Sequence, residues 1–224
     1  MVNIMIERLK WLRQNLQMPQ DHEQYLKGLD INPQVIYDIG SCTLHWYDMA
    51  RRIWPNARII CFDAMHGADE FYRQAGVEYY AGFLSDQDQG VTNFWSNRDH
   101  PAGNSAYREN PQLSPLSTEI YTNQHQSFKL TRTLDSVMAQ HGWPKPDFIK
   151  IDVQGSELDI FRGSVKVLEH CQTVIAEVQS QPYNMGAPLC DEVTEYLADC
   201  NFNMINPRFS GTEIQGDAHY TKCT

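Results

Sequence analysis

The chain has 224 residues, of which 42% are hydrophobic and 21% charged, a composition typical of folded globular proteins and unlike that of disordered chains. Its formal net charge of −10 at pH 7 excludes a protein whose main task is to hold a phosphate backbone, because that task needs an excess of Lys and Arg. We therefore expect no nucleic-acid partner and a small neutral or cationic ligand.

Two helical segments open the chain. Residues 3–17 place Ile6, Leu9, Leu12 and Leu16 at helical spacing, which predicts an amphipathic helix. Residues 20–29 form a second, shorter helical pattern that leads into a proline at position 33. We interpret residues 1–32 as an N-terminal helical segment and residues 33–224 as one folded domain, a size that a single α/β domain commonly has.

Strand patterns alternate with helical patterns after this point, which predicts an α/β fold whose mostly parallel central sheet has helices on both faces. Short apolar runs rich in Val, Ile, Phe or Tyr lie at 34–38, 58–62, 77–80, 148–152, 173–178 and 202–206. Helical patterns fall between them at 44–53, 67–75, 133–141, 156–170 and 190–200.

The regular pattern stops in a long insertion at about 98–127, which is rich in Asn, Pro, Ser, Gly and aromatic residues. A loop of this length in a compact domain is usually a lid, a binding segment or disordered. His100, Asn104 and Ser105 in this insertion are candidate contacts for an acceptor substrate, although a single histidine in a loop is more often merely solvated.

The first predicted strand ends in a turn that suits a ligand. Asp38, Gly40 and Ser41 follow the buried run at the carboxyl end of that strand, where ligands bind in open α/β sheets. A dinucleotide site needs three glycines spaced as G-x-G-x-x-G, and only Gly40 is present. The turn therefore favours a ligand without phosphates, such as S-adenosylmethionine. The alternative is a purely structural strand-turn-helix.

A carboxylate at the end of the second strand strengthens this interpretation. Asp63 lies 23 positions after Gly40, close to the spacing at which an acidic residue holds a ribose diol. The alternative is that Asp63 caps the following helix.

The most specific run in the sequence is Pro146-Asp147-Phe148-Ile149-Lys150-Ile151-Asp152-Val153-Gln154-Gly155-Ser156-Glu157. It resembles the D-x-I-K-x-D-V-Q-G-x-E segment of the FkbM-type methyltransferases. The resemblance extends over residues 34–220 and includes the D-I-G turn, Phe62-Asp63, Leu84-Ser85-Asp86, Gly103-Asn104-Ser105, Thr133-Leu134-Asp135 and the strand around Glu177.

The resemblance implies a Rossmann-like class I methyltransferase fold with an antiparallel C-terminal strand. It also implies an S-adenosylmethionine-dependent O-methyltransferase that acts on a hydroxyl group, most often of a sugar or glycan. The implied cofactor contacts are Asp38, Gly40, Ser41, Asp63, Ala64, Ser85 and Asp152. This chain departs from the family at two places: the bulky residues 42–46 follow its D-I-G turn, and Asp63-Ala64 stands where many members carry Glu-Pro.

Methyl transfer to a hydroxyl needs alignment and a proton acceptor within hydrogen-bond reach. Asp152, at the end of a central strand, is the first candidate for the base, although it could equally cap the next helix. Asp217 and His219, near the C-terminus, are further catalytic candidates. Asp152, Glu157, Glu177 and Asp217 could offer oxygen ligands to Mg²⁺, but their spacing does not show that they converge, so a required metal is not favoured.

Two other functions stay open on the sequence. One is a nucleotide-linked oxidoreductase on the same fold, which the missing glycines count against. The other is a non-catalytic methyltransferase-like module that binds a partner through the N-terminal helix and the insertion. The sequence does not identify the acceptor or the oligomeric state.

The remaining patterns concern location. The six cysteines show no close pairing of the kind that marks zinc sites or disulfide frameworks, so they are expected to be reduced thiols. No apolar stretch reaches the roughly 20 residues that span a bilayer, and the start of the chain lacks a signal-peptide core. We expect a cytoplasmic protein with no membrane partner.

Overall fold

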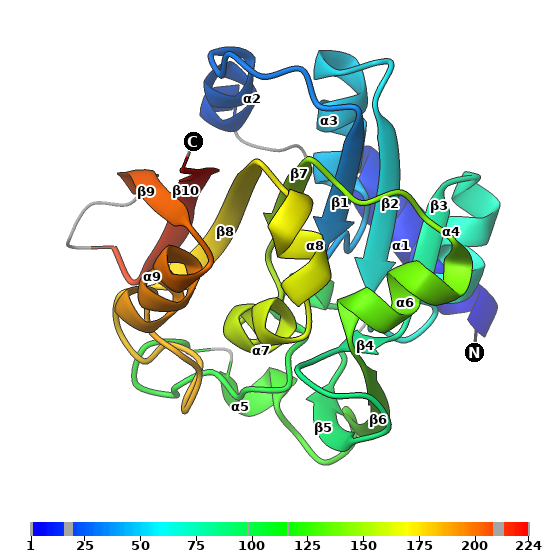
Figure 1. Cartoon of the computed structure of the whole chain (residues 1–224). Helices are drawn as coiled ribbons and strands as arrows, with labels where there is room; N and C mark the ends of the chain where they lie inside the picture. The colour runs from blue at the N-terminus through cyan, green and yellow to red at the C-terminus, as the bar shows by residue number, and fades with distance from the viewer. Residues whose placement is uncertain (1, 16–19, 98, 116, 208–212, 224) are drawn as a thin grey trace.

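The computed structural model describes residues 2–15, 20–97, 99–115, 117–207 and 213–223 (Figure 1). The helices are α1 (Val2–Asn15), α2 (Gln20–Lys27), α3 (His45–Ile53), α4 (Ala68–Ala75), α5 (Ser117–Ile120), α6 (Leu134–His141), α7 (Glu157–Arg162), α8 (Val165–His170) and α9 (Cys190–Asp199), with a 3-10 turn η1 at Pro101–Gly103. The strands are β1 (Val35–Ile39), β2 (Arg58–Asp63), β3 (Glu78–Ala81), β4 (Phe83–Leu84), β5 (Val91–Trp95), β6 (Gln126–Arg132), β7 (Phe148–Ile151), β8 (Thr173–Gln179), β9 (Phe202–Pro207) and β10 (Gln215–Lys222).

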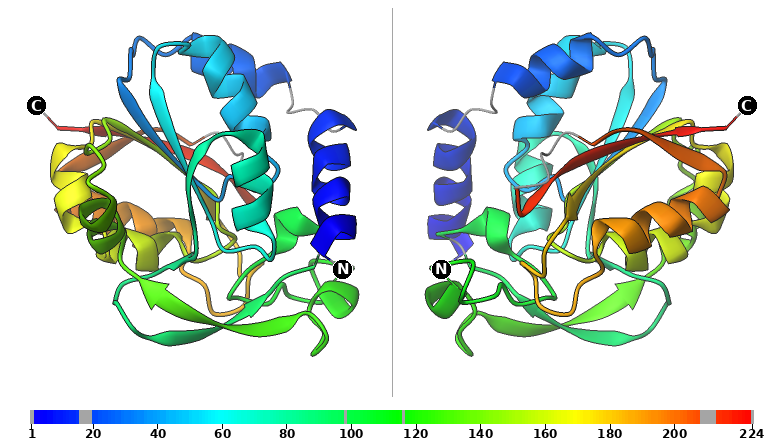
Figure 2. Two further views of the ribbon diagram at one scale, coloured as in Figure 1. Left: turned by 90° about the vertical axis from the view of Figure 1, so that its right-hand side faces the viewer. Right: turned by 90° about the vertical axis from the view of Figure 1, so that its left-hand side faces the viewer.

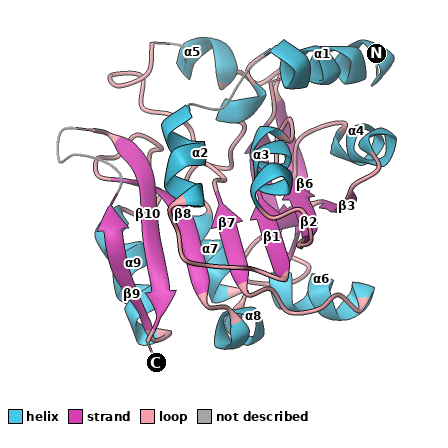
Figure 3. Cartoon of the chain, turned by 90° about the horizontal axis from the view of Figure 1, so that it is seen from above, coloured by secondary structure: helices cyan, strands magenta, loops and turns pink. Residues whose placement is uncertain are grey.

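A seven-stranded sheet in the order β3-β2-β1-β7-β8-β10-β9 forms the centre of the molecule. β3, β2, β1, β7 and β8 pair in parallel with one another in this order, whereas β10 runs antiparallel to both β8 and β9. Figure 3 shows the β10 arrow pointing opposite to that of β8. These findings confirm the predicted α/β fold, including its antiparallel C-terminal strand.

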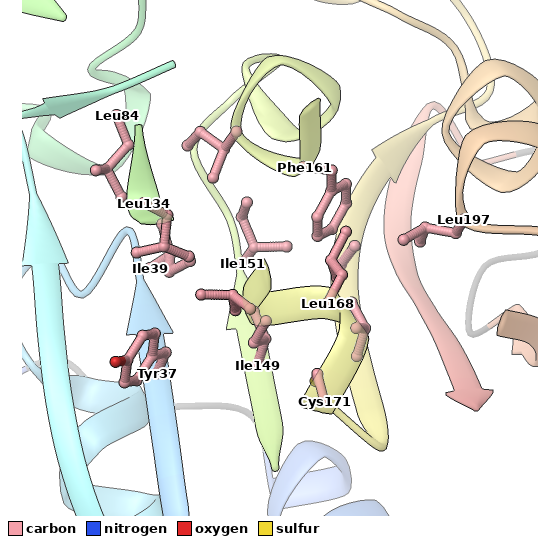
Figure 4. Packing of buried hydrophobic residues seen from close by; sticks show 14 of the residues in the cluster. Tyr37, Ile39, Leu84, Leu134, Ile149, Ile151, Phe161, Leu168, Cys171 and Leu197 are labelled. Carbon is pink, nitrogen blue, oxygen red and sulfur yellow. The ribbon is translucent and has the colours of Figure 1, made fainter. Parts of the chain in front are cut away.

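Helices cover both faces of this sheet, as predicted. One face buries Tyr37 and Ile39 of β1 with Ile149 and Ile151 of β7 in a cluster that also contains residues of α6 to α9 (Figure 4). The other face buries Ile36 and Phe148 against the tryptophans and Met49 of the α3 region. Successive strand residues point to opposite faces, so β1 and β7 are apolar on both sides except at one register position.

That register position places polar groups inside the sheet. Asp38 of β1 pairs with Lys150 of β7, Lys150 pairs with Ile175 of β8, and Ile175 pairs with His219 of β10. Residues paired in register share a face, and this row lies on the side covered by α2 and α3. The buried charges near the carboxyl ends of β1 and β7 therefore come from a single row across the sheet.

The first N-terminal helix, α1, packs on α4. Ile6, Leu9 and Leu12 of α1 are buried in one cluster with Phe71 and Tyr72 of α4, and Figure 2 shows α1 lying beside α4. The first predicted helix is thus confirmed over the described residues, and Leu16 lies outside them. The predicted boundary between residues 32 and 33 stays a prediction.

The single helix predicted over 156–170 is wrong in one respect, because the structure divides it into α7 and α8. Gly163 lies between α7 and α8, and a Cβ there would lie 2.1 Å from the carbonyl oxygen of Ser85. The backbone at Ser85 therefore packs directly against the point where the two helices separate. Asp135 then caps α8 by accepting the backbone N–H groups of Lys166 and Val167 at 2.9 and 3.0 Å.

A second sheet, in the order β4-β6-β5, was not predicted. β5 and β6 pair antiparallel on either side of the insertion, and Phe128 and Leu130 of β6 are exposed, which hides the usual strand pattern. The insertion at about 98–127 contains η1 and α5 within its described residues, and a β-bridge between Trp95 and Ser105 holds its first half. Among the helices of the described residues, none is long and apolar enough to cross a membrane.

Candidate functional site

Two adjoining cavities lie at the carboxyl ends of the parallel strands, as expected for a ligand site in an open α/β sheet. The first cavity has a volume of about 390 Å³ and the second about 570 Å³. Asp152 and Glu177 line both cavities, as do Gly40 and Cys42 of the turn after β1. Residues 101–103 of the insertion also border both, so the insertion forms a wall that the two cavities share.

The turn after β1 has the tight geometry that the sequence predicted. Gly40 has φ +80°, and a Cβ there would lie 1.8 Å from the carbonyl oxygen of Asp152, so only glycine fits. The Ser41 hydroxyl donates to the Asp38 carbonyl oxygen at 2.6 Å. Cys42 and Leu44 also have positive φ, at 44° and 69°, a conformation that their residue types did not signal.

Asp63 joins the ends of β1 and β2. One carboxylate oxygen accepts the Cys42 backbone N–H and the other accepts the Met65 N–H, both at 2.7 Å. Burial raises the pKa of Asp63, against the effect of these hydrogen bonds. Asp63 and its neighbour Ala64 also line the first cavity. The carboxylate thus fixes two backbone turns and lies on the cavity wall, whereas the N-cap of the following helix, α4, is Gly67. Its contact with a ribose stays a prediction.

An apolar wall, which the sequence analysis missed, completes the first cavity. It consists of Phe62 at the end of β2, Phe83 and Leu84 of β4, and Phe94 of β5. The Phe83 and Phe94 rings meet edge to face with their centroids 5.7 Å apart. Phe94 is buried in a strand whose other residues are more exposed.

Lys150 lies at the centre of a buried charge cluster. Its ammonium nitrogen is 3.6 Å from Asp38 Oδ1, 3.6 Å from Asp152 Oδ2 and 3.3 Å from the Gly40 carbonyl oxygen. Burial opposes its charge, but Asp152 and Asp38 outweigh burial and raise the pKa of Lys150. Asp38 is fully buried, lines neither cavity, and neither carboxylate oxygen has a hydrogen-bond partner among the described residues. Burial raises the pKa of Asp38 to about 6.

Gln154 connects the two carboxyl groups that line both cavities. Its amide nitrogen donates to Asp152 Oδ1 at 2.9 Å and to Glu177 Oε2 at 2.5 Å. Burial opposes ionisation of Asp152, but Lys150 and hydrogen bonds from Glu177 and Gln154 outweigh it and lower the pKa of Asp152. Burial and the neighbouring Asp152 raise the pKa of Glu177. Asp152 is therefore the more readily ionised member of the pair.

Several predicted site residues do line the cavities. Asn104 borders the first cavity, where its side-chain oxygen accepts the Asn97 backbone N–H at 2.7 Å. Ser41, His100 and Asp217 border the second cavity. His22 of α2, which the sequence analysis did not select, borders the second cavity as well.

Besides Asp38, three predicted site residues line neither cavity. The Ser85 hydroxyl donates to Asp86, and the Ser85 backbone packs against Gly163. Ser105 is fully buried, and its hydroxyl donates to the Gln154 carbonyl oxygen at 2.6 Å and accepts the Tyr107 N–H at 2.8 Å.

His219, the third of these residues, is 2% exposed, because β10 is an interior strand and α2 covers this part of it. Its Nδ1 lies 2.8 Å from the Tyr25 hydroxyl, and burial lowers its pKa. The structure thus places Asp38, Ser85, Ser105 and His219 away from both cavities, and it gives no support to the cofactor contacts expected of Asp38 and Ser85, the acceptor contact expected of Ser105 or the direct catalytic role expected of His219.

The acidic residues do not form a metal site in the described part of the chain, where no group of three or more His, Cys, Asp or Glu side chains could hold an ion. Glu157 is directed instead to backbone, accepting the N–H groups of Val153 and Gly155 at 3.0 Å each. Burial raises the pKa of Glu157 to about 7. The chemistry of these residues gives no support to Mg²⁺.

The side chains that line the first cavity suit the chemical groups of S-adenosylmethionine. Its apolar wall suits a flat heterocycle, Asp63 at the end of β2 suits a ribose diol, and ionised Asp152 suits a cationic amino acid group. The one-glycine turn lacks the features that a pyrophosphate needs.

Comparison with known proteins agrees with this geometry. The model of the methyltransferase FkbM domain family matches residues 66–204, more than half of the chain. No curated protein matches the chain. A crystal structure of the methyltransferase FkbM from Methylobacillus flagellatus KT superposes with a TM-score of 0.55 at 11% identity, covering 93% of this chain and 49% of that one.

An O-methyltransferase family protein from Burkholderia thailandensis has a TM-score of 0.50 at 7% identity, covering 91% of this chain and 55% of that one. This chain thus spans about half the length of each of these two structures, and at such identities the likeness shows the fold alone. The family match itself covers β3, β7 and β8 and the segment from Lys150 to Glu157. The chain therefore belongs to the methyltransferase FkbM domain family, whose members are S-adenosylmethionine-dependent methyltransferases.

Proposed function

We propose that this chain is an O-methyltransferase that binds S-adenosylmethionine in the first cavity and the hydroxyl group of a sugar or glycan in the second. One observation carries the proposal: the two cavities adjoin, and both are bordered by Asp152 and Glu177. A donor in one cavity can therefore meet an acceptor in the other along a shared boundary.

The second cavity has the lining that a polyhydroxyl acceptor needs. Carboxyl groups of Asp99, Glu109 and Asp217, the imidazole of His100 and the hydroxyl of Ser114 border it. Such groups accept or donate hydrogen bonds to many hydroxyls at once, whereas Trp46 offers a flat apolar surface on the same wall. The choice of a sugar or glycan follows from this lining and from the family.

The residues at the boundary have separate tasks in this proposal. S-adenosylmethionine, when bound, supplies an electrophilic methyl carbon on a positively charged sulfur. Asp152 holds the cationic donor with its ionised carboxylate, and Asp63 orients the ribose. Residues 101–103 form the common wall, which limits water at the boundary and aligns the acceptor oxygen, the main requirement of an in-line displacement.

A binding experiment tests the first half of the proposal. S-adenosylmethionine and S-adenosylhomocysteine should both raise the melting temperature, whereas NAD and NADP should not, because the turn lacks the glycines for a pyrophosphate. Equal stabilisation by NAD would favour the oxidoreductase instead.

A transfer experiment tests the second half. The chain is incubated with methyl-labelled donor and a panel of sugars and glycans, beside matched amine and thiol acceptors. Label on a hydroxyl product supports O-methylation. Donor binding without transfer to any hydroxyl acceptor would contradict it and favour the non-catalytic module.

A further inference from the structure

An imidazole and a carboxylate from two distant parts of the chain meet on the wall of the second cavity. His22 Nδ1 of α2 lies 3.6 Å from Asp217 Oδ2 of β10, with the side chains 29% and 22% exposed. Both residues border the second cavity. Because Nδ1 faces the carboxylate, Nε2 is the ring nitrogen that lies away from it.

The packing of α2 on β10 explains why these two side chains meet. Three residues after His22, on the same face of the helix, the Tyr25 hydroxyl lies 2.8 Å from His219 Nδ1. Two residues after Asp217, on the same face of the strand, stands His219. Two contacts thus hold α2 on β10. The contact between Tyr25 and His219 is buried, and the neighbouring contact between His22 and Asp217 borders the second cavity.

We propose that His22, oriented by Asp217, is the general base that accepts the proton of the acceptor hydroxyl. This proposal rests on the proposed O-methyltransferase function. Imidazole is the side chain that most often serves as a general base, and a carboxylate at its other nitrogen both orients the ring and stabilises the imidazolium that forms.

Two other candidates for this role are already engaged. Lys150 and the Gln154 amide hold Asp152 as an anion, and an anion stabilised in this way is a weak proton acceptor. His45 also borders the second cavity, but its two ring nitrogens lie 2.8 Å from Thr43 Oγ1 and 3.1 Å from the Leu12 carbonyl oxygen.

The step balances without a further reactant. The acceptor oxygen forms a bond to the methyl carbon while the carbon–sulfur bond breaks, and the sulfur keeps that electron pair as the neutral thioether of S-adenosylhomocysteine. The hydroxyl proton passes to His22 Nε2, and the imidazolium returns it to solvent when the products leave. Asp217 takes up no proton in this step and acts as a positioning residue.

The test compares His22→Gln, Asp217→Asn and the double variant with the parent chain. His22→Gln should lower kcat by about 10²–10⁴-fold, the usual contribution of a general base, while the dissociation constant of S-adenosylhomocysteine stays within about twofold. Asp217→Asn should lower kcat less, and adding it to His22→Gln should cause almost no further loss, since it acts through the imidazole. His170→Gln, an exposed histidine on α8, is the matched control and should retain parental turnover.

A rescue experiment separates chemistry from structure. In His22→Ala, free imidazole should restore a measurable part of kcat, whereas in the control variant it should have no effect. The proposal is overturned if His22→Gln keeps kcat within about threefold of the parent, if Asp217→Asn is equally costly with and without His22, or if imidazole rescues nothing. Failure of the parent chain to methylate any hydroxyl, with donor bound, would instead overturn the proposed function and this inference together.

Discussion

Lys150 and Asp152 stand two residues apart at the end of β7, and the Lys150 ammonium nitrogen lies 3.6 Å from Asp152 Oδ2. The same ammonium is 3.6 Å from Asp38 Oδ1, beneath the turn after β1. A single buried cation therefore links the fully buried carboxylate of Asp38 to the carboxylate that borders both cavities.

Replacing that cation should destabilise the fold. In Lys150→Met, the carboxylate of Asp38 keeps its burial but loses the ammonium group beside it, so we expect the free energy of unfolding to fall by about 3–5 kcal/mol. Urea unfolding at pH 7 measures the change, with the exposed Lys166→Met of α8 as the control, expected within about 0.5 kcal/mol of the parent. A loss below 1 kcal/mol for Lys150→Met would show that water or relaxation compensates Asp38.

The buried carboxyl of Asp38 should also make stability depend on pH. Burial raises its pKa to about 6 in the folded chain, above its value in the unfolded chain, so the folded state binds the proton more tightly. This contribution to stability is complete below about pH 4 and is lost as pH rises through about 6. Asp38→Asn lacks the titration, and its stability relative to the parent should improve by about 3 kcal/mol between pH 4 and pH 7.

Unfolding curves at several pH values check this difference. The exposed Asp199→Asn at the end of α9 is the control, and its curve should run parallel to that of the parent. A parallel curve for Asp38→Asn as well would mean that Asp38 titrates alike in the folded and unfolded chains.

Six of the seven strands of the central sheet could be predicted because each has its own local pattern, whereas β10 was expected only from the family resemblance. β1, β7 and β8 are short apolar runs that end in polar residues, and the helices between them repeat apolar residues at helical spacing. β5 and β6 could not be predicted in this way, since Val91, Phe128 and Leu130 are exposed and invert the expected alternation.

Cavity residues that belong to local sequence motifs could be predicted, whereas cavity residues that long-range packing brings to the site could not. The turn with Gly40 and the segment with Asp152 are local motifs, and both border the cavities. His22 reaches the second cavity because α2 packs on β10, which lies almost two hundred residues later in the chain. The same packing buries His219. In the sequence, His219 and Asp217 lie two positions apart, and nothing in this spacing distinguishes the buried residue from the one that borders the cavity.

Asp63 should contribute to both ligand binding and stability. Asp63→Ala removes the carboxylate on the wall of the first cavity, and we expect donor binding to weaken by about 1–3 kcal/mol. It also leaves the N–H groups of Cys42 and Met65 without their acceptor, so a loss of unfolding free energy of about 1–3 kcal/mol should accompany it. Calorimetric titration with S-adenosylhomocysteine, beside urea unfolding, measures the two effects. Unchanged affinity in a folded variant would place the ribose elsewhere.

Asp152→Asn distinguishes a residue that holds the donor from one that takes the proton. Asn keeps the size of Asp but removes the charge, so a donor-holding role predicts weaker binding of S-adenosylmethionine, by about tenfold or more, at a kcat that recovers when the donor is saturating. A role as the base predicts the reverse: nearly normal donor affinity with kcat lowered by about 10²–10⁴-fold at saturating donor and acceptor. Because Lys150 and Gln154 already stabilise the carboxylate, we expect the first result. Donor titration and steady-state kinetics on the same preparation separate the two, and the second result would transfer the role of base from His22 to Asp152.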